Sequence, residues 1–149
     1  ELIQSRGQKV FYEGKLADKI VEDFSQNGGL ISSEDLFNYK VYLKDPICGI
    51  YKEYDVCSMP LPSSGGVAII QMLNIIENFD LKNYSHNSLE YIELLMNIMS
   101  FAYDDRSKYL VDQEFFDAPV ENLISKEYAE RISRKDSEYA KKISRKLGS

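Results

Sequence analysis

The sequence contains no threonine and a single histidine, His86, so several kinds of site cannot be built from these 149 residues. One histidine excludes a multi-histidine metal cluster, and the lack of threonine excludes a threonine nucleophile on this chain. Long apolar runs are also missing, because stretches such as Val67 to Ile70 are too short to cross a bilayer and no basic segment with an apolar run opens the chain. We therefore expect no metal site and no membrane partner.

The residues that are present have the composition of a folded protein, with 44% hydrophobic and 28% charged side chains. A chain of this length can bury one sizeable core, and no linker or repeat is visible, so we expect a single domain over residues 1–149. Because the first residue is Glu1 rather than methionine, we expect the chain to begin inside a longer protein. The missing leader then says nothing about the compartment, which we leave open.

Charge is distributed unevenly along the chain. The net charge is −6, yet residues 131–149 contain seven Lys or Arg side chains against Asp136 and Glu138. The acidic remainder argues against a nucleic-acid partner. We interpret residues 133–149 as a polar basic tail with a solvated helical face, which is a commoner role for terminal charge clusters than phosphate binding.

Apolar spacing predicts five helices. The first includes Phe11 to Phe24 and ends at Asn27-Gly28-Gly29, and a short second helix begins at Ser32 with Asp35 completing a capping box and ends near Tyr39. The other three are a helix buried on most sides from about Val67 to Phe79, a long amphipathic helix from Asn87 or Ser88 to about Tyr109, and a fifth near Ser125 to Ile132. In the long helix we expect Glu90 to close a capping box on Asn87, and we take as its apolar pattern Leu89, Ile92, Leu95, Met96, Met99, Ala102 and Tyr103.

Residues 47–59 alternate like a β-hairpin around the polar pair Lys52-Glu53. If these two are the turn, Cys48 faces Cys57 at a position where the Cα atoms approach to roughly 4.5 Å, which lies within disulfide range. A longer loop with a shifted register stays open, because Lys-Glu lacks the Gly or Asn that two-residue turns favour. We predict neighbouring sulfurs whose redox state depends on the compartment, and neither cysteine resembles a catalytic thiol.

Three polar features could support chemistry, and each has a structural explanation that we favour. Ser63-Ser64-Gly65-Gly66 precedes a helix and could bind an anion, but serine capping with a glycine turn is the commoner role. Asp104-Asp105-Arg106 holds adjacent carboxylates about 100° apart on a helix, so we expect an aspartate to pair with Arg106 or cap a neighbour. His86 lies in a polar loop, and no G-x-S-x-G or nucleotide-binding glycine motif occurs.

Several motifs resemble those of the gamma-glutamyltransferase (gamma-glutamyltranspeptidase) family, in family order from about Val10 to Ala129. They include Asn27-Gly28-Gly29-Leu30-Ile31-x-x-Glu34-Asp35-Leu36, Pro60-x-Pro62-Ser63-Ser64-Gly65-Gly66 and Ala102-Tyr103-x-Asp105-Arg106-Ser107. The sequence departs from the family where Val111-Asp112-Gln113 replaces Gly-Asp-Pro and where Asp104 replaces alanine.

The resemblance implies an N-terminal-nucleophile hydrolase made as a precursor, which cuts itself to expose a threonine that attacks a gamma-glutamyl amide. It identifies this chain as the C-terminal part of the large subunit, a mainly helical α+β fragment of a larger αββα fold. No catalytic, substrate-binding or metal residue of the family then falls on this sequence, and no cofactor is implied. The expected partners are the small subunit and the N-terminal part of the same precursor, a small gamma-glutamyl substrate, and a homo-oligomer as an allowed assembly.

Two alternatives stay open. A relative that acts on poly-gamma-glutamate would share the same motifs. A protein of another class, a non-catalytic helical interaction module, would retain the scaffold after losing the chemistry.

Overall fold

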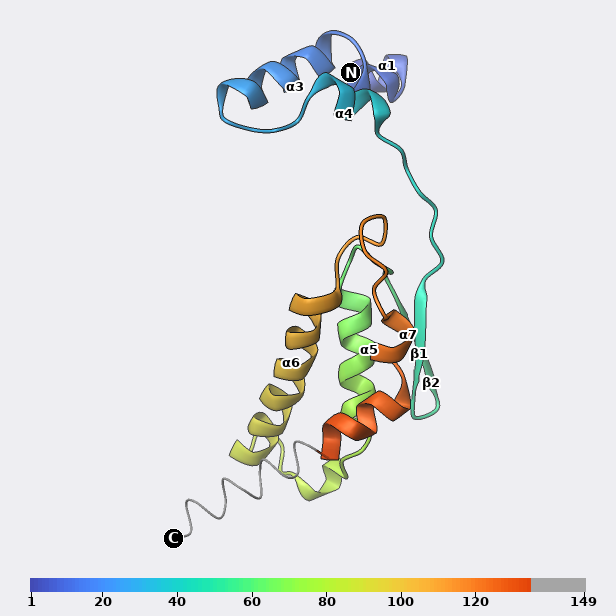
Figure 1. The fold of residues 1–149 in the computed structure, drawn as a ribbon, viewed down its shortest axis with the longest axis vertical. Coiled ribbons are helices and arrows are strands. Elements are labelled where there is room, and N and C mark those ends of the chain that lie inside the picture. Colours follow the sequence, from blue (N-terminus) through green and yellow to red (C-terminus); the bar gives the residue numbers. More distant parts are fainter. Residues whose placement is uncertain (135–149) are drawn as a thin grey trace. The chain divides into compact units, whose positions relative to one another are not determined.

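The computed structural model describes residues 1–134, and its contacts group the chain into two compact units, Glu1–Leu43 and a second unit that begins at Lys44 (Figure 1). The sequence patterns indicate one domain without a linker, so this division is a feature that they do not reveal. Apart from its first two residues, the basic tail at 133–149 lies outside the described residues.

The first unit consists of four short helices: α1 (Leu2–Arg6), α2 (Lys9–Tyr12), α3 (Lys15–Gln26) and α4 (Ser33–Asn38). The predicted helix from Phe11 to Phe24 is wrong at its start, because Gly14, at φ 79°, separates α2 from α3. The capping box of α4 is confirmed: Ser32 Oγ accepts from the Asp35 N–H at 3.2 Å, and the Asp35 carboxylate accepts from the Ser32 N–H at 2.8 Å.

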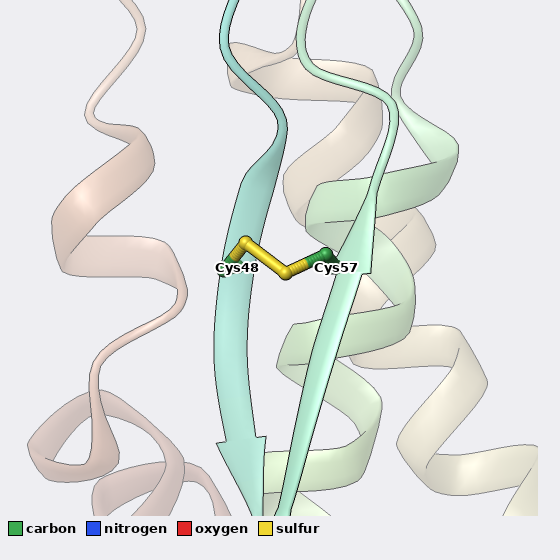
Figure 2. The surroundings of a disulfide bond; sticks show 2 residues. All are labelled: Cys48 and Cys57. Carbon is green, nitrogen blue, oxygen red and sulfur yellow. A yellow bond between two sulfur atoms is a disulfide. The ribbon is translucent and has the colours of Figure 1, made fainter.

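The second unit opens with the predicted hairpin, formed by β1 (Ile47–Tyr51) and β2 (Tyr54–Ser58). The strands pair antiparallel with Tyr51 opposite Tyr54 and Cys48 opposite Cys57, so the register predicted from a Lys52-Glu53 turn is confirmed. Lys52 adopts φ 54°, which provides the left-handed conformation that the turn requires without a glycine. The two cysteines form a disulfide with Cα atoms 4.1 Å apart and sulfurs 2.11 Å apart (Figure 2).

Helix α5 (Gly65–Ile76) is the centre of this unit, as its nearly continuous apolar surface predicts. It contacts both strands on one side, and α6 (Leu89–Tyr109) and α7 (Val120–Leu123) pack against it as well (Figure 1). A 3-10 turn, η1 (Leu81–Asn83), follows α5, and residues 126–134 are helical. One apolar cluster surrounds Leu61 and Val67, and a second includes Ile75 and Ile98.

One detail of the predicted helices changes, and another is confirmed. The cap of α6 is Ser88, whose Oγ accepts from the Tyr91 N–H at 3.3 Å, whereas Asn87 has φ 57° and makes no capping box with Glu90. The predicted fifth helix is present, and Ser125 Oγ accepts from the Tyr128 N–H at 3.1 Å at its start. The short elements α1, α7 and η1 have too few residues for a periodic signal, and the sequence patterns do not indicate them.

Candidate functional site

The most deeply buried polar cluster of the described residues centres on Asp105, which is 7% exposed on α6. Its Oδ2 accepts hydrogen bonds from Gln71 Nε2 at 2.6 Å and from the Tyr128 hydroxyl at 2.5 Å. A buried carboxyl group is costly unless it is hydrogen-bonded, and these two bonds satisfy that requirement. Asp105 therefore joins α5, α6 and the helical segment 126–134 through one side chain.

A neighbouring amide extends this cluster along α5. Asn74 lies three residues after Gln71, on the same helix face, and its Nδ2 donates to the Ile124 carbonyl at 2.5 Å. Both amides are at least 97% buried, and Gln71 Oε1 and Asn74 Oδ1 have no hydrogen-bond partner among the described protein atoms. The donors of this face are thus used within the unit, while two acceptors remain unsatisfied.

Tyr128 shows the electrostatic effect of this environment. Burial of the ring, followed by the hydrogen bond to Asp105, raises the pKa of the Tyr128 hydroxyl well above its ordinary value. The hydroxyl is therefore protonated at neutral pH and donates to the carboxylate. The Tyr128 hydroxyl thus stabilises the packing of the helices and is not available to a substrate as a base or nucleophile.

The motif serine does not cap α5. Ser64 is helical in conformation and makes no capping hydrogen bond, and its Oγ instead accepts from Arg106 Nε at 2.9 Å. The serine cap expected before α5 is therefore not formed by Ser64, and among the described residues no ion pair joins an aspartate to Arg106. Asp104 is exposed and lies 4.0 Å from Lys108, one turn further along α6, so the two adjacent aspartates have entirely different partners.

The glycines of the same motif have a packing role. A Cβ at Gly66 would collide with the Met59 carbonyl oxygen and lie 2.8 Å from Ile47 Cγ2, so glycine lets α5 approach the hairpin backbone. A Cβ at Gly65 would meet no atom closer than 3.9 Å. One residue of the pair is thus required by close approach, which is the structural explanation rather than an anion site.

Glu77 joins the turn of the hairpin to the end of α5. Its carboxylate accepts from the Lys52 backbone N–H at 2.7 Å and from Lys126 Nζ, which also donates to the Ile50 carbonyl at 2.7 Å. These hydrogen bonds, the one from Lys126 first, lower the pKa of Glu77 below its ordinary value. A shallow pocket of about 160 Å³ lies beside Glu77 and is lined by Tyr51, Phe79, Asp80 and Lys82 among others.

The remaining candidates do not form a reactive group. His86 is exposed in its loop, as predicted, and the cysteines are joined in the disulfide. Within residues 1–134 no three His, Cys, Asp or Glu side chains are placed to hold a metal ion. Among the helices of that range, none has the length and apolar character needed to cross a membrane.

Comparison with known proteins decides the family. A sequence model of the gamma-glutamyltranspeptidase family matches residues 1–146. The chain belongs to this family. It is 44% identical over 133 residues to the glutathione hydrolase proenzyme of Escherichia coli (strain K12), a match that covers 89% of this chain and 23% of that relative.

Solved structures agree with this assignment. The gamma-glutamyltranspeptidase of Helicobacter pylori matches with a TM-score of 0.82 and 41% identity, over 89% of this chain and 38% of that one. The cephalosporin acylase of Bacillus halodurans matches with a TM-score of 0.75 and 30% identity, over 89% of this chain and 24% of the acylase. Both neighbours have the N-terminal-nucleophile hydrolase fold, so this chain is a mainly helical part of that fold. It spans about a quarter of the length of its curated relatives.

The partners of Asp105 are the part of the site that sequence reasoning missed. A usable signal was present, because Gln71 and Asn74 are polar residues three apart inside the otherwise apolar helix α5. Polar side chains on a buried helix face require partners. The pattern cannot identify those partners, since Asp105 and Tyr128 follow 34 and 57 residues after Gln71.

Proposed function

We propose that this chain is framework of the large subunit of a gamma-glutamyltransferase-type enzyme. The full-length protein would hydrolyse or transfer gamma-glutamyl groups of glutathione-like substrates with a threonine nucleophile that this chain does not contain. The observation that carries the proposal is the family match over residues 1–146 in a sequence without threonine. On this proposal the 149-residue chain alone is inactive, and it needs no cofactor.

The described chemistry supports a framework role. Each of four polar side chains makes a hydrogen bond that joins separate elements of the second unit: Asp105, Tyr128, Arg106 and Glu77. The small subunit and the N-terminal part of the precursor are then the partners that would complete the reactive site. The match to an acylase fits the same general reaction, attack on an amide bond by an N-terminal nucleophile.

A chimera tests the proposal. The segment of the E. coli glutathione hydrolase proenzyme that corresponds to this chain is replaced by the chain, and both maturation into two subunits and release of p-nitroaniline from a gamma-glutamyl anilide are measured. We expect maturation and activity in the chimera, and neither in the free chain. A matched control replaces the nucleophilic threonine of the parent enzyme by alanine, which removes both readouts.

The opposite results have clear meanings. A chimera that folds without maturing favours the non-catalytic interaction module. Activity in the free chain would place a nucleophile on these residues and overturn the proposal.

A further inference from the structure

Helix α6 presents a second apolar face that stays exposed among the described residues of the second unit. Its buried face packs along α5 and includes Leu94, Ile98 and Ala102 (Figure 1). A second set of residues, which we call the α6 stripe, recurs at spacings of three and four and is 42–68% exposed: Leu89, Ile92, Met96, Met99 and Tyr103. These residues belong to the apolar pattern that the sequence predicts for a single amphipathic helix, and the structure divides that pattern between two faces.

The spacing of the α6 stripe matches the seam of a helix pair. Apolar residues at alternating intervals of three and four average one per 3.5 residues, the repeat that keeps two helices in contact along their length. The stripe extends over 14 residue steps, or about 21 Å of helix. Scattered exposed apolar residues are ordinary, whereas a continuous seam of this length indicates an interaction site.

The charges beside the stripe restrict its partner. The residue that follows each stripe member is polar or acidic: Glu90, Glu93, Asn97, Ser100 and Asp104. Asp104 lies near Lys108, but within residues 1–134 neither Glu90 nor Glu93 has a cationic partner. This acidic edge calls for a basic edge on whatever covers the stripe.

A second copy of the chain does not provide that basic edge. In a two-fold antiparallel pair of α6 helices the same edge of each helix faces its counterpart, so acidic residues would oppose acidic residues. In a parallel pair the acidic edge of one helix would face the opposite edge of the other, which already packs on α5 and is not basic. The remainder of the polypeptide is a better source, since the matched relatives are about four times as long as the matched segment.

We propose that the α6 stripe docks an amphipathic helix with a basic edge, which comes from the part of the precursor outside these 149 residues. This inference rests on the proposed function, because it assumes that the chain is assembled within a larger enzyme. It adds the surface of contact and the chemistry of the contacting segment.

The test uses the free chain and the chimera with the E. coli enzyme in parallel. Met96→Glu places a charge in the stripe, and Met59→Glu is its control, because Met59 is also exposed (68% against 63%) and lies outside α6. Glu93→Lys reverses the charge of the acidic edge, with exposed Glu127→Lys as its control. Melting temperature, oligomeric state by light scattering and maturation are measured for each variant.

We expect a monomeric free chain whose melting temperature is the same, within about 2 °C, with and without Met96→Glu or Glu93→Lys. In the chimera the same two variants lower the melting temperature by at least about 3 °C and reduce maturation, while both controls match the parent.

Other outcomes overturn the inference. A free chain that forms dimers which Met96→Glu dissolves would assign the stripe to a second copy. If the chimera folds and its melting temperature is unchanged by both variants, the stripe stays uncovered. A folded parent chimera that does not mature refutes the proposed function alone, because the melting shifts still test the docking surface, and a parent chimera that does not fold overturns both.

Discussion

Asp104 and Asp105 are adjacent in the sequence and have opposite environments. Asp105 is buried between Gln71 and Tyr128, whereas Asp104 is exposed beside Lys108. Replacing Asp105 by alanine leaves a buried amide and a hydroxyl without an acceptor, which we expect to lower the free energy of unfolding by about 2–3 kcal/mol. Asp104→Ala is the matched control and should change it by less than about 0.5 kcal/mol. Urea denaturation compares the two, and equal effects would contradict the assignment of Asp105 as the central partner.

Tyr128 makes stability depend on alkaline pH. Since the pKa of its hydroxyl is higher in the folded chain than its ordinary value near 10, the stabilisation is complete below that pH. It is lost as the pH rises from there towards the raised pKa, because the unfolded chain releases the proton first. We expect the free energy of unfolding to fall more steeply between about pH 9 and pH 11 for the parent than for Tyr128→Phe. Denaturation series at several pH values measure this difference, and identical slopes would refute it.

At the scale of elements, the close approach of α5 to the hairpin depends on a glycine within α5. A Cβ at Gly66 would collide with backbone at Met59, whereas Gly65 has open space. Gly66→Ala should lower the free energy of unfolding by about 1–3 kcal/mol through overpacking. Gly65→Ala should leave it unchanged or raise it by up to about 1 kcal/mol, because alanine favours a helix more than glycine does. Thermal melts of the two variants measure this difference. If Gly66→Ala does not lower the melting temperature, α5 lies further from the strands.

The hairpin carries its own covalent support. The Cys48–Cys57 disulfide closes a short loop, with a sequence separation of nine. In the chain-entropy treatment such a loop stabilises the folded state by about 2–3 kcal/mol. We expect reduction with dithiothreitol to lower the denaturation midpoint of the parent. A Cys48→Ser, Cys57→Ser double variant should be insensitive to the reductant, and a parent chain that is equally insensitive would contradict the bond.

At the scale of the whole molecule, the core belongs to one unit. Both apolar clusters lie in the second unit, while Ala17 is the one buried residue within residues 1–43. A chain truncated to begin at Lys44 should therefore unfold cooperatively, with a midpoint within about 3 °C of the full chain. Circular dichroism melts measure it. Loss of the cooperative transition would show that the first unit contributes to the core of the second.

Local chemistry explains why parts of the fold could be predicted from the sequence. The capping box of α4 joins Ser32 and Asp35, three positions apart, and strand alternation sets the cysteine pairing once the turn is placed. Such features depend on neighbours within a few residues, so a motif can specify them. The short helices contain too few residues for an apolar periodicity. The break at Gly14 is also hidden, because the φ angle of a glycine within a helical stretch cannot be inferred from the sequence.

The hydrogen bonds of the site could not be predicted in this way. Ser64 and Arg106 were each visible as polar residues of a motif, but the hydrogen bond between them joins positions 42 residues apart. Likewise the apolar pattern of α6 was readable, and its division into a face on α5 and an uncovered stripe was not. Periodicity shows that a helix has an apolar side without showing what packs there.

The sequence by itself indicated the family, a hairpin with Cys48 near Cys57 and the positions of the longer helices, because these depend on motifs and on short-range geometry. Only the tertiary structure decided that Asp105 bridges three helical segments, that Gly66 rather than Gly65 is needed for close packing, and that α6 retains an exposed apolar face. The physical reason is that burial and hydrogen-bond partnership are set by segments far apart along the chain, which meet only when the molecule folds.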